Sequence, residues 1–208
     1  MNNFPRTALR FAGEKLRRRA MPRLFTGLDI PRMLRDDLAL MKGSLAQARW
    51  SEPDDYHLTL RFIGDVEAGL AREIDLTLAA IRQPPFTLTL DALDCLGGDK
   101  PHSLVVRAQA SPALLDLQGA IERRLQRIGL PAEPRKFVPH FTLARINGMS
   151  ARSVADYLAA RGLFRSRGFE ANAFVLFSAR ALTGGGPYVV EADYPLEREP
   201  ARWALAGR

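Results

Sequence analysis

The sequence predicts a pseudo-symmetric α+β domain made of two similar halves, with two antiparallel sheets and helices outside them. Three observations support this fold class. Segments with strand-type and helix-type spacing follow each other in the same order in both halves. The pattern His-x-Thr-x occurs at residues 57–60 (HLTL) and again at 140–143 (HFTL), 83 residues later. These two histidines are two of the three in 208 residues.

The first half opens with an apolar run that is typical of a buried strand and stops at Pro31. Amphipathic spacing then predicts helices on either side of the first motif strand. A clean alternation after Pro85, with a glycine-containing turn at 97–99, predicts a hairpin. The expected elements are, in order, a strand at 24–30, a helix at 32–46, a strand at 57–63, a helix at 67–81, and strands at 86–96 and 103–107.

The second half repeats this order. Ser111 is a typical N-cap, with Pro112 at the first helical position and Gly129 as the end signal. A proline-containing loop at 131–139 leads into the second motif. The triple glycine at 184–186 lacks the following Lys-Ser/Thr of a phosphate-binding loop, so we expect a hairpin turn there. The expected elements are a helix at 112–128, a strand at 140–146, a helix at 150–160, and strands at 169–178 and 188–196.

The net charge of +7 is concentrated at the N-terminus. Residues 1–23 carry seven basic residues and one acidic residue, a net +6, which leaves +1 for the remaining 185. Any basic RNA-binding surface on the body must therefore be local. We expect a basic, disordered extension at 1–21, one domain at 22–197 and a tail at 198–208.

Three interpretations of the basic extension are open. The first is a disordered arm that adds non-specific phosphate affinity. The second is an organelle transit peptide, although the usual serines are missing. The third is a start assigned too far upstream, with translation beginning at Met21, directly before the first strand. We favour a dispensable extension.

The repeated motif combines an imidazole with a hydroxyl. Alternate side chains of a strand share a face, so His57 and Thr59 point one way while Leu58 and Leu60 point the other. The same holds for His140 and Thr142 in the second motif. If the halves face each other, one imidazole takes a proton from an attacking oxygen and the other protonates a leaving oxygen. The hydroxyls donate to the non-bridging oxygens of a phosphodiester.

Two arginines are candidate phosphate ligands, with ordinary surface charge as the alternative. Arg61 shares the face of His57 and Thr59 by strand parity. Arg145 lies five residues after His140, where parity alone points it away, so a bulge or twist is needed to bring it to the site.

A metal site is not expected. Two histidines without a third His, Cys or carboxylate nearby match no common zinc pattern, and the single cysteine, Cys95, excludes multi-cysteine sites and an internal disulfide. His102 lacks a threonine two residues later, so we expect an exposed turn residue. No run of apolar residues is long enough to cross a membrane.

The sequence resembles the two-histidine phosphoesterase superfamily, and within it the RNA 2′,3′-cyclic phosphodiesterases, also called the 2′-5′ RNA ligase family. The likeness covers about residues 22–197. Besides Tyr188, the segments that carry it are 23–31 (RLFTGLDIP), 57–64 (HLTLRFIG), 137–145 (FVPHFTLAR) and 174–182 (FVLFSARAL).

This resemblance implies a bilobal fold with a central cleft between the motifs, no metal or other cofactor, and hydrolysis of RNA 2′,3′-cyclic phosphate ends to 2′-phosphates. By carry-over, His57 is the proton donor and His140 the acceptor, while Thr59, Thr142 and Arg145 hold the phosphate. We expect a cytoplasmic monomer that needs no protein partner. Two alternatives stay open: an enzyme for small cyclic nucleotides or ADP-ribose cyclic phosphate, and a non-catalytic domain that binds RNA ends.

Overall fold

The computed structural model describes residues 23–43, 45, 48–161, 168–179 and 187–197. The predicted extension at 1–21, the tail at 198–208 and the glycines at 184–186 lie outside these residues. Within the described chain, strands and helices follow the order predicted from the sequence.

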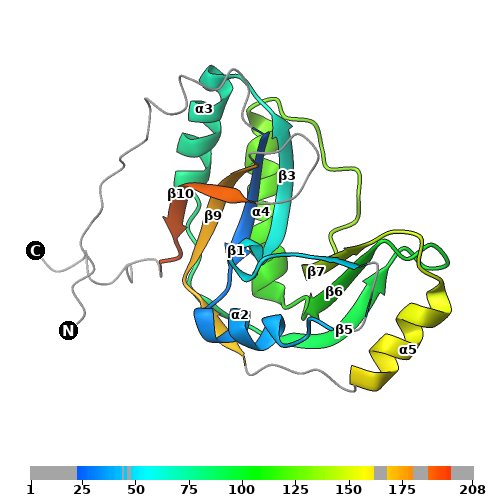
Figure 1. The fold of residues 1–208 in the computed structure, drawn as a ribbon. Coiled ribbons are helices and arrows are strands. Elements are labelled where there is room, and N and C mark those ends of the chain that lie inside the picture. Colours follow the sequence, from blue (N-terminus) through cyan, green and yellow to red (C-terminus); the bar gives the residue numbers. More distant parts are fainter. Residues whose placement is uncertain (1–22, 44, 46–47, 162–167, 180–186, 198–208) are drawn as a thin grey trace, which may run out of the picture.

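Most strands form one antiparallel sheet in the order β10–β9–β1–β3–β7–β6–β5 (Figure 1). Their bounds are β1 Arg23–Asp29, β3 His57–Asp65, β5 Leu90–Leu96, β6 Ser103–Ala108, β7 His140–Ile146, β9 Ala173–Ala179 and β10 Tyr188–Pro195. A short strand that the sequence did not predict, β2 (Ala48–Trp50), pairs with β7. Strands β4 (Phe86–Leu88) and β8 (Phe169–Ala171) form a separate two-stranded sheet.

The large sheet has two parts that meet at one register pair, Leu58 of β3 with Phe141 of β7. On one side of this junction β3 pairs with β1 along its whole length. On the other side, one edge of β7 pairs with β6. The opposite edge of β7 pairs with β3 at the junction and with β2 beyond it. The two expected antiparallel sheets are therefore present and joined at the motif strands. Each combines both halves of the sequence, because the β5–β6 hairpin of the first half pairs with β7 and the β9–β10 hairpin of the second half pairs with β1.

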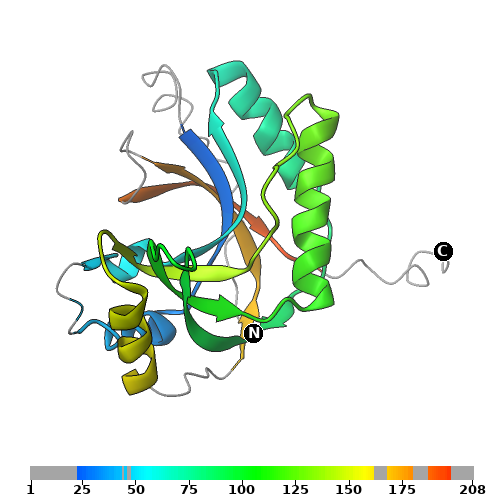
Figure 2. The ribbon, with the colours of Figure 1, turned by 90° about the vertical axis from the view of Figure 1, so that its right-hand side faces the viewer.

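Four helices in the described chain lie outside this sheet: α2 Arg32–Ala39, α3 Ala68–Ala79, α4 Pro112–Arg127 and α5 Ala151–Arg161. Helices α3 and α4 pack against each other and cover β10 and β3, whereas α5 lies beside β5 at the other end (Figures 1 and 2). The Ser111 hydroxyl accepts a hydrogen bond from the Leu114 N–H and caps α4 as predicted. Gly129 follows with a φ of +89°, where a side chain would be strained.

Two predicted strands are each interrupted once. The carbonyl of Thr89 accepts from the N–H of Gln109, and the carbonyl of Asn172 accepts from the N–H of Leu196. At these two points the backbone turns from the small β4–β8 sheet into the large sheet. Helix α2 is also shorter than expected, because it ends at Ala39 in two successive turns rather than continuing to residue 46.

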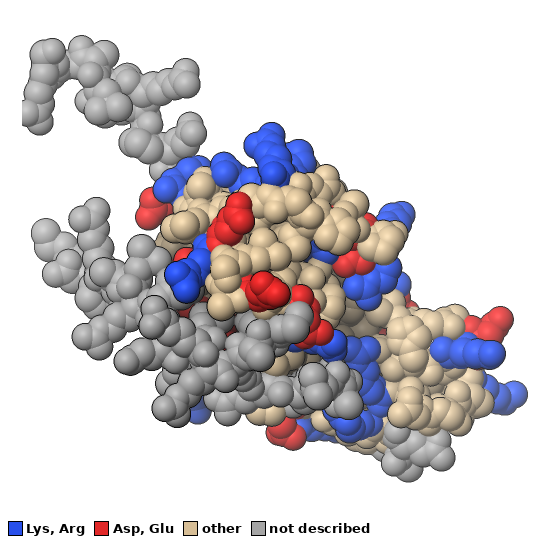
Figure 3. All heavy atoms as spheres, turned by 90° about the horizontal axis from the view of Figure 1, so that it is seen from above, with Lys and Arg blue, Asp and Glu red and all other residues tan. Residues whose placement is uncertain are grey.

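Charge is scattered over the surface. Viewed from above, the Lys and Arg side chains form several separate groups with acidic side chains between them (Figure 3). On this face the charges therefore form no single continuous basic patch.

Candidate active site

The four motif side chains lie on one face of the sheet. His57, Thr59, His140 and Thr142 are half-buried. The intervening side chains are in the core, with Leu58, Phe141 and Leu143 fully buried and Leu60 nearly so. Strand parity thus predicted both faces of each motif correctly. We call the face with the imidazoles and hydroxyls the motif face.

The two motifs are related by a local two-fold axis. The paired residues Leu58 and Phe141 are 83 positions apart, the same offset as between the two histidines. In an antiparallel pair, the residue before one partner lies beside the residue after the other. His57 therefore neighbours Thr142 across the junction, and Thr59 neighbours His140. The two motifs thus bring each histidine position next to the threonine position of the other motif.

Both imidazoles are oriented by the same backbone contact. Nδ1 of His57 lies 2.8 Å from the carbonyl oxygen of Asp55, and Nδ1 of His140 lies 2.7 Å from that of Val138. A carbonyl only accepts, so each Nδ1 carries the hydrogen and donates it. In the neutral ring, Nε2 then has a free lone pair. Both histidines are thus prepared to exchange a proton through Nε2.

An aromatic cage surrounds His57. Its ring centroid lies 4.8 Å from that of Phe25, 5.6 Å from that of Phe177 and 4.7 Å from that of Tyr188, which meets it edge-on. Burial in this cage lowers the pKa of His57 to about 4, and the charges of His140 and Arg145 act in the same direction. The free protein therefore holds His57 neutral at pH 7.

His140 has a more polar environment. Burial lowers its pKa as well, and positive charge from Arg107, Arg145 and His102 adds to this effect. Arg107 is its register partner on β6 and forms an ion pair with Asp94 of β5.

A bulge brings Arg145 to the motif face. Between the register pairs Leu104–Ala144 and Val105–Thr142, Leu143 is an extra residue on β7. Leu143 and Ala144 consequently both point into the core, and Arg145 is exposed. The bulge that the sequence argument required is present. Nη1 of Arg145 donates to Oγ of the buried Ser103 at 2.9 Å.

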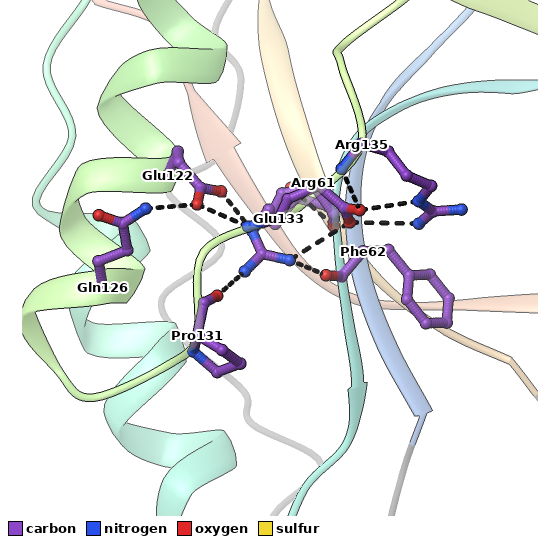
Figure 4. Close-up of polar contacts among 8 residues, drawn as sticks. Arg61, Phe62, Glu122, Gln126, Pro131, Glu133 and Arg135 are labelled. Atoms are coloured by element: carbon purple, nitrogen blue, oxygen red, sulfur yellow. Dashed lines mark hydrogen bonds and ion pairs between the residues drawn. The ribbon is translucent and has the colours of Figure 1, made fainter.

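Arg61 lies elsewhere, so its placement by strand parity is wrong. The matching bulge in β3, where Leu60 is the extra residue between the pairs Gly27–Thr59 and Thr26–Arg61, turns Arg61 to the core side. Its side chain is 6% exposed and forms ion pairs with Glu122 of α4 and Glu133 of the following loop (Figure 4).

Figure 4 shows that this cluster joins the strand of the first motif to the segment before the second. The Arg61 guanidinium also donates to the carbonyls of Phe62 and Pro131. Glu133 in turn accepts from Nε of Arg135 at 2.7 Å. With Arg61 turned inward, its successor Phe62 occupies the position on β3 that Arg145 has on β7, and its side chain is 38% exposed.

Several residues of the motif face were not identified from the sequence. Ser103 and Arg107 come from β6, Arg49 from the unpredicted strand β2, and Tyr188 from β10. A signal existed for Arg107, a charge in the otherwise apolar strand 103–108. His102 is exposed, as predicted, and its Nδ1 lies 3.0 Å from Oγ of Ser103.

The described residues contain no cluster of three His, Cys, Asp or Glu side chains arranged to hold a metal ion. The acids before the first motif have other contacts. Asp54 pairs with Arg35, and Oδ1 of Asp55 accepts from the N–H of Tyr188 at 3.1 Å. None of the helices in the described ranges is long and apolar enough to cross a membrane.

Comparisons with known proteins agree with this geometry. A curated protein of Aeropyrum pernix, named RNA 2′,3′-cyclic phosphodiesterase, is 35% identical over 53% of this chain and 66% of its own length. A protein of the same name from Escherichia coli is 33% identical over 59% of this chain and 71% of its own length. The crystal structure of E. coli LigT with 3′-AMP superposes with a TM-score of 0.69 at 23% identity, covering 86% of this chain and 99% of that one.

The family model described as LigT-like phosphoesterase matches residues 28–106 and 104–188, one match for each half. Each match contains one His-x-Thr-x motif, as the local two-fold axis through Leu58 and Phe141 requires. The chain therefore belongs to the LigT-like phosphoesterases and is an enzyme of the two-histidine class.

Proposed function

We propose that this enzyme hydrolyses RNA 2′,3′-cyclic phosphodiester ends to 2′-phosphomonoesters, using its two histidines and no metal. The observation that carries the proposal is the matched pair of Nδ1–carbonyl contacts, which leave both Nε2 atoms available on one face. The name shared by the curated relatives supports this substrate.

In the proposed reaction His140 acts as the base. Its Nε2 takes a proton from a water molecule as the water oxygen bonds to phosphorus. The bond from phosphorus to the ribose 3′-oxygen breaks, and Nε2 of His57 gives its proton to that oxygen. Water is consumed and a 2′-phosphate with a free 3′-hydroxyl results. The assignment of donor and acceptor follows the family resemblance, because the contacts of the two rings are alike.

The phosphate is stabilised by groups from both lobes. The hydroxyls of Thr59 and Thr142 donate to the non-bridging oxygens, whose negative charge increases in the transition state. The Arg145 guanidinium, positioned by Ser103, adds charge-assisted hydrogen bonds. Because the charge of Arg145 lowers the pKa of both histidines, Arg145 lies within electrostatic reach of both.

Substrate binding also favours the protonated form of His57. With a pKa of about 4, His57 is rarely protonated at neutral pH in the free enzyme. An anionic phosphodiester next to the ring favours the imidazolium and raises this pKa. Substrate binding and protonation of His57 are therefore coupled, and Nε2 donates its proton readily because the aromatic cage disfavours the charge.

Phe62 provides a place for the nucleobase. It takes the position related to Arg145 by the local two-fold axis, so the motif face has a cation on one side and an exposed aromatic ring on the other. A base stacked on Phe62 would direct its phosphate toward Arg145. We infer that this difference between the halves orients the substrate.

The test is hydrolysis of an oligoribonucleotide with a 2′,3′-cyclic phosphate end in the presence of excess EDTA, with identification of the product isomer. We expect a 2′-phosphate. His57→Ala and His140→Ala should each reduce kcat by about 10²–10⁴-fold, the usual contribution of a general acid or base. A 3′-phosphate product would reverse the assigned geometry, and full activity in either variant would refute the mechanism.

The same groups would also join a 2′,3′-cyclic end to a 5′-hydroxyl. The hydroxyl replaces water: His140 takes its proton as its oxygen bonds to phosphorus, the bond to the 3′-oxygen breaks, His57 protonates that oxygen, and a 2′-5′ linkage results. We also infer that the enzyme acts as a monomer in the cytoplasm, where Cys95 would remain a free thiol. Size-exclusion chromatography with light scattering tests the oligomeric state.

A further inference from the structure

Two arginines face each other on the motif face beside the candidate active site. In the pairing of β2 with β7, Arg49 is the register partner of Arg145. Arg145 is in turn the partner of Ser103 on β6, so the three residues form one row across three strands. Directly opposed residues of an antiparallel pair project from the same face, with their Cβ atoms about 5 Å apart. Arg49 therefore extends from the same face as Arg145.

The neighbour of Arg49 confirms its direction. The Trp50 ring lies 6.3 Å, between centroids, from the ring of Tyr157 on α5, and it packs against the core. Since alternate side chains point to opposite faces, Arg49 is on the other face, where it is exposed. Within the part of the chain that the structure describes, neither Arg49 nor Arg145 forms an ion pair with a carboxylate.

Like charges directly opposite each other destabilise a sheet. An arginine pair without acidic partners is therefore a cost to folding that an anion between or beside the two guanidinium groups would remove. Arg145 already has a partner in the Ser103 hydroxyl and lies within electrostatic reach of both catalytic histidines. Among the described residues, Arg49 has no comparable side-chain hydrogen bond.

Arg49 and Arg145 differ in which groups of the site their charges affect. The charge of Arg145 affects His57, His140 and Tyr188, whereas that of Arg49 affects Tyr188 and neither histidine. In the row across β6, β7 and β2, Arg145 is the central residue and Arg49 is the outer one. This position suits a second anionic group of the substrate, one nucleotide away from the scissile phosphate.

We propose that Arg49 binds the phosphodiester on the 5′ side of the nucleotide that carries the cyclic phosphate, so that the enzyme prefers an RNA chain end to a cyclic mononucleotide. This inference rests on the proposed function and specifies its substrate class. A mononucleotide with a 5′-hydroxyl lacks this phosphate and leaves Arg49 unoccupied. Arginine suits the role because its planar guanidinium contacts two phosphate oxygens at once.

The experiment compares kcat/KM for two substrates that share the same cyclic end: adenosine 2′,3′-cyclic phosphate and the dinucleotide ApA with a 2′,3′-cyclic phosphate. In Arg49→Gln we expect the ratio of dinucleotide to mononucleotide to fall about ten-fold, mainly through KM. The slope of log affinity against log salt for the dinucleotide should become less steep by about 0.7, the value for one single-strand phosphate contact. Arg152→Gln, an exposed arginine on α5, is the matched control and should leave the ratio unchanged.

A dinucleotide with an uncharged methylphosphonate linkage provides the complementary test. In the wild type it should lose the advantage of the dinucleotide, and Arg49→Gln should cause no further loss. An unchanged ratio in Arg49→Gln, or an equal loss for both natural substrates, overturns the proposal. Calorimetric binding of the 2′-phosphate products of both substrates makes the same comparison without turnover. A wild type that binds these products but hydrolyses neither substrate would refute the proposed function and still report on Arg49.

Discussion

Leu58 and Phe141 are paired at the centre of the molecule, and the local two-fold axis that relates the two motifs passes between them. Both side chains are fully buried. In this register the position of His57 is next to that of Thr142, and the position of Thr59 is next to that of His140, so each histidine strand meets the threonine of the other motif. The site is thus shared between two lobes through a contact that itself has no polar side chain.

The two threonines should contribute to the transition state rather than to the fold. Thr59→Val and Thr142→Val keep the shape of the side chain and remove the hydroxyl. We expect each to reduce kcat by about 10²-fold, as the loss of a donor to a developing oxyanion does, with a smaller change in KM. Steady-state kinetics measures the effect, and an unchanged melting temperature verifies the fold. Wild-type kcat in both variants would exclude the hydroxyls from the mechanism.

The two arginines after the motifs should behave in opposite ways. Arg145→Ala should abolish most of the activity and leave the free energy of unfolding nearly unchanged, because Arg145 is exposed. Arg61→Ala should lower the free energy of unfolding by about 3 kcal/mol, because it leaves Glu122 and Glu133 without their buried partner. Chemical denaturation with parallel activity assays separates the two. A strong loss of kcat in a fully folded Arg61→Ala protein would contradict this division.

Phosphate binding should change the titration of His57. Inorganic phosphate next to the ring favours the imidazolium, so the pKa of His57 should rise above its free value of about 4. Arg145→Ala should raise the pKa of both His57 and His140 in the free protein, since the charge of Arg145 lowers both. NMR titration of the His57 and His140 rings, with and without phosphate, measures these values. No rise for His57 would argue against an anion site at its ring.

The buried neutral His57 also makes stability depend on pH. Its pKa is lowered on folding, from 6.5 to about 4, so between these values the unfolded chain binds a proton that the folded chain does not. The contribution is complete above pH 6.5 and is lost as the pH falls toward 4. His57→Phe should flatten the curve of unfolding free energy in this window, by about 3 kcal/mol. Identical curves for wild type and His57→Phe would show that the ring is more solvated than its cage implies.

Strand parity predicted most of the candidate site from the sequence, and bulges explain where it failed. The alternation His-x-Thr-x placed four side chains correctly because the register is regular up to Thr59 and Thr142. One residue later both strands contain an extra leucine, Leu60 or Leu143, which turns the next residue inward. A bulge depends on the neighbouring strand, so spacing along one strand cannot reveal it.

The remaining site residues depend on contacts between distant segments. Ser103 and Arg49 reach the motif face only through pairing with β7, and β2 has just three residues, which is too short for a periodic signal. Tyr188 closes the cage of His57 through a hydrogen bond from its N–H to Asp55, 133 residues earlier. These partners follow from topology rather than from local sequence preference.

The joint between the lobes has a mechanical consequence. Strands β3 and β7 share a single register pair, so rotation of one lobe against the other about this pair breaks few main-chain hydrogen bonds. Such a rotation changes the distance between the two imidazoles. The salt-bridge cluster of Arg61 and Glu133 crosses this joint on its far side, from the strand of His57 to the loop that precedes His140. Because it links the strand of one motif histidine to the loop before the other, we expect this ion-pair cluster to restrict rotation of the lobes and so to hold the distance between the two imidazoles.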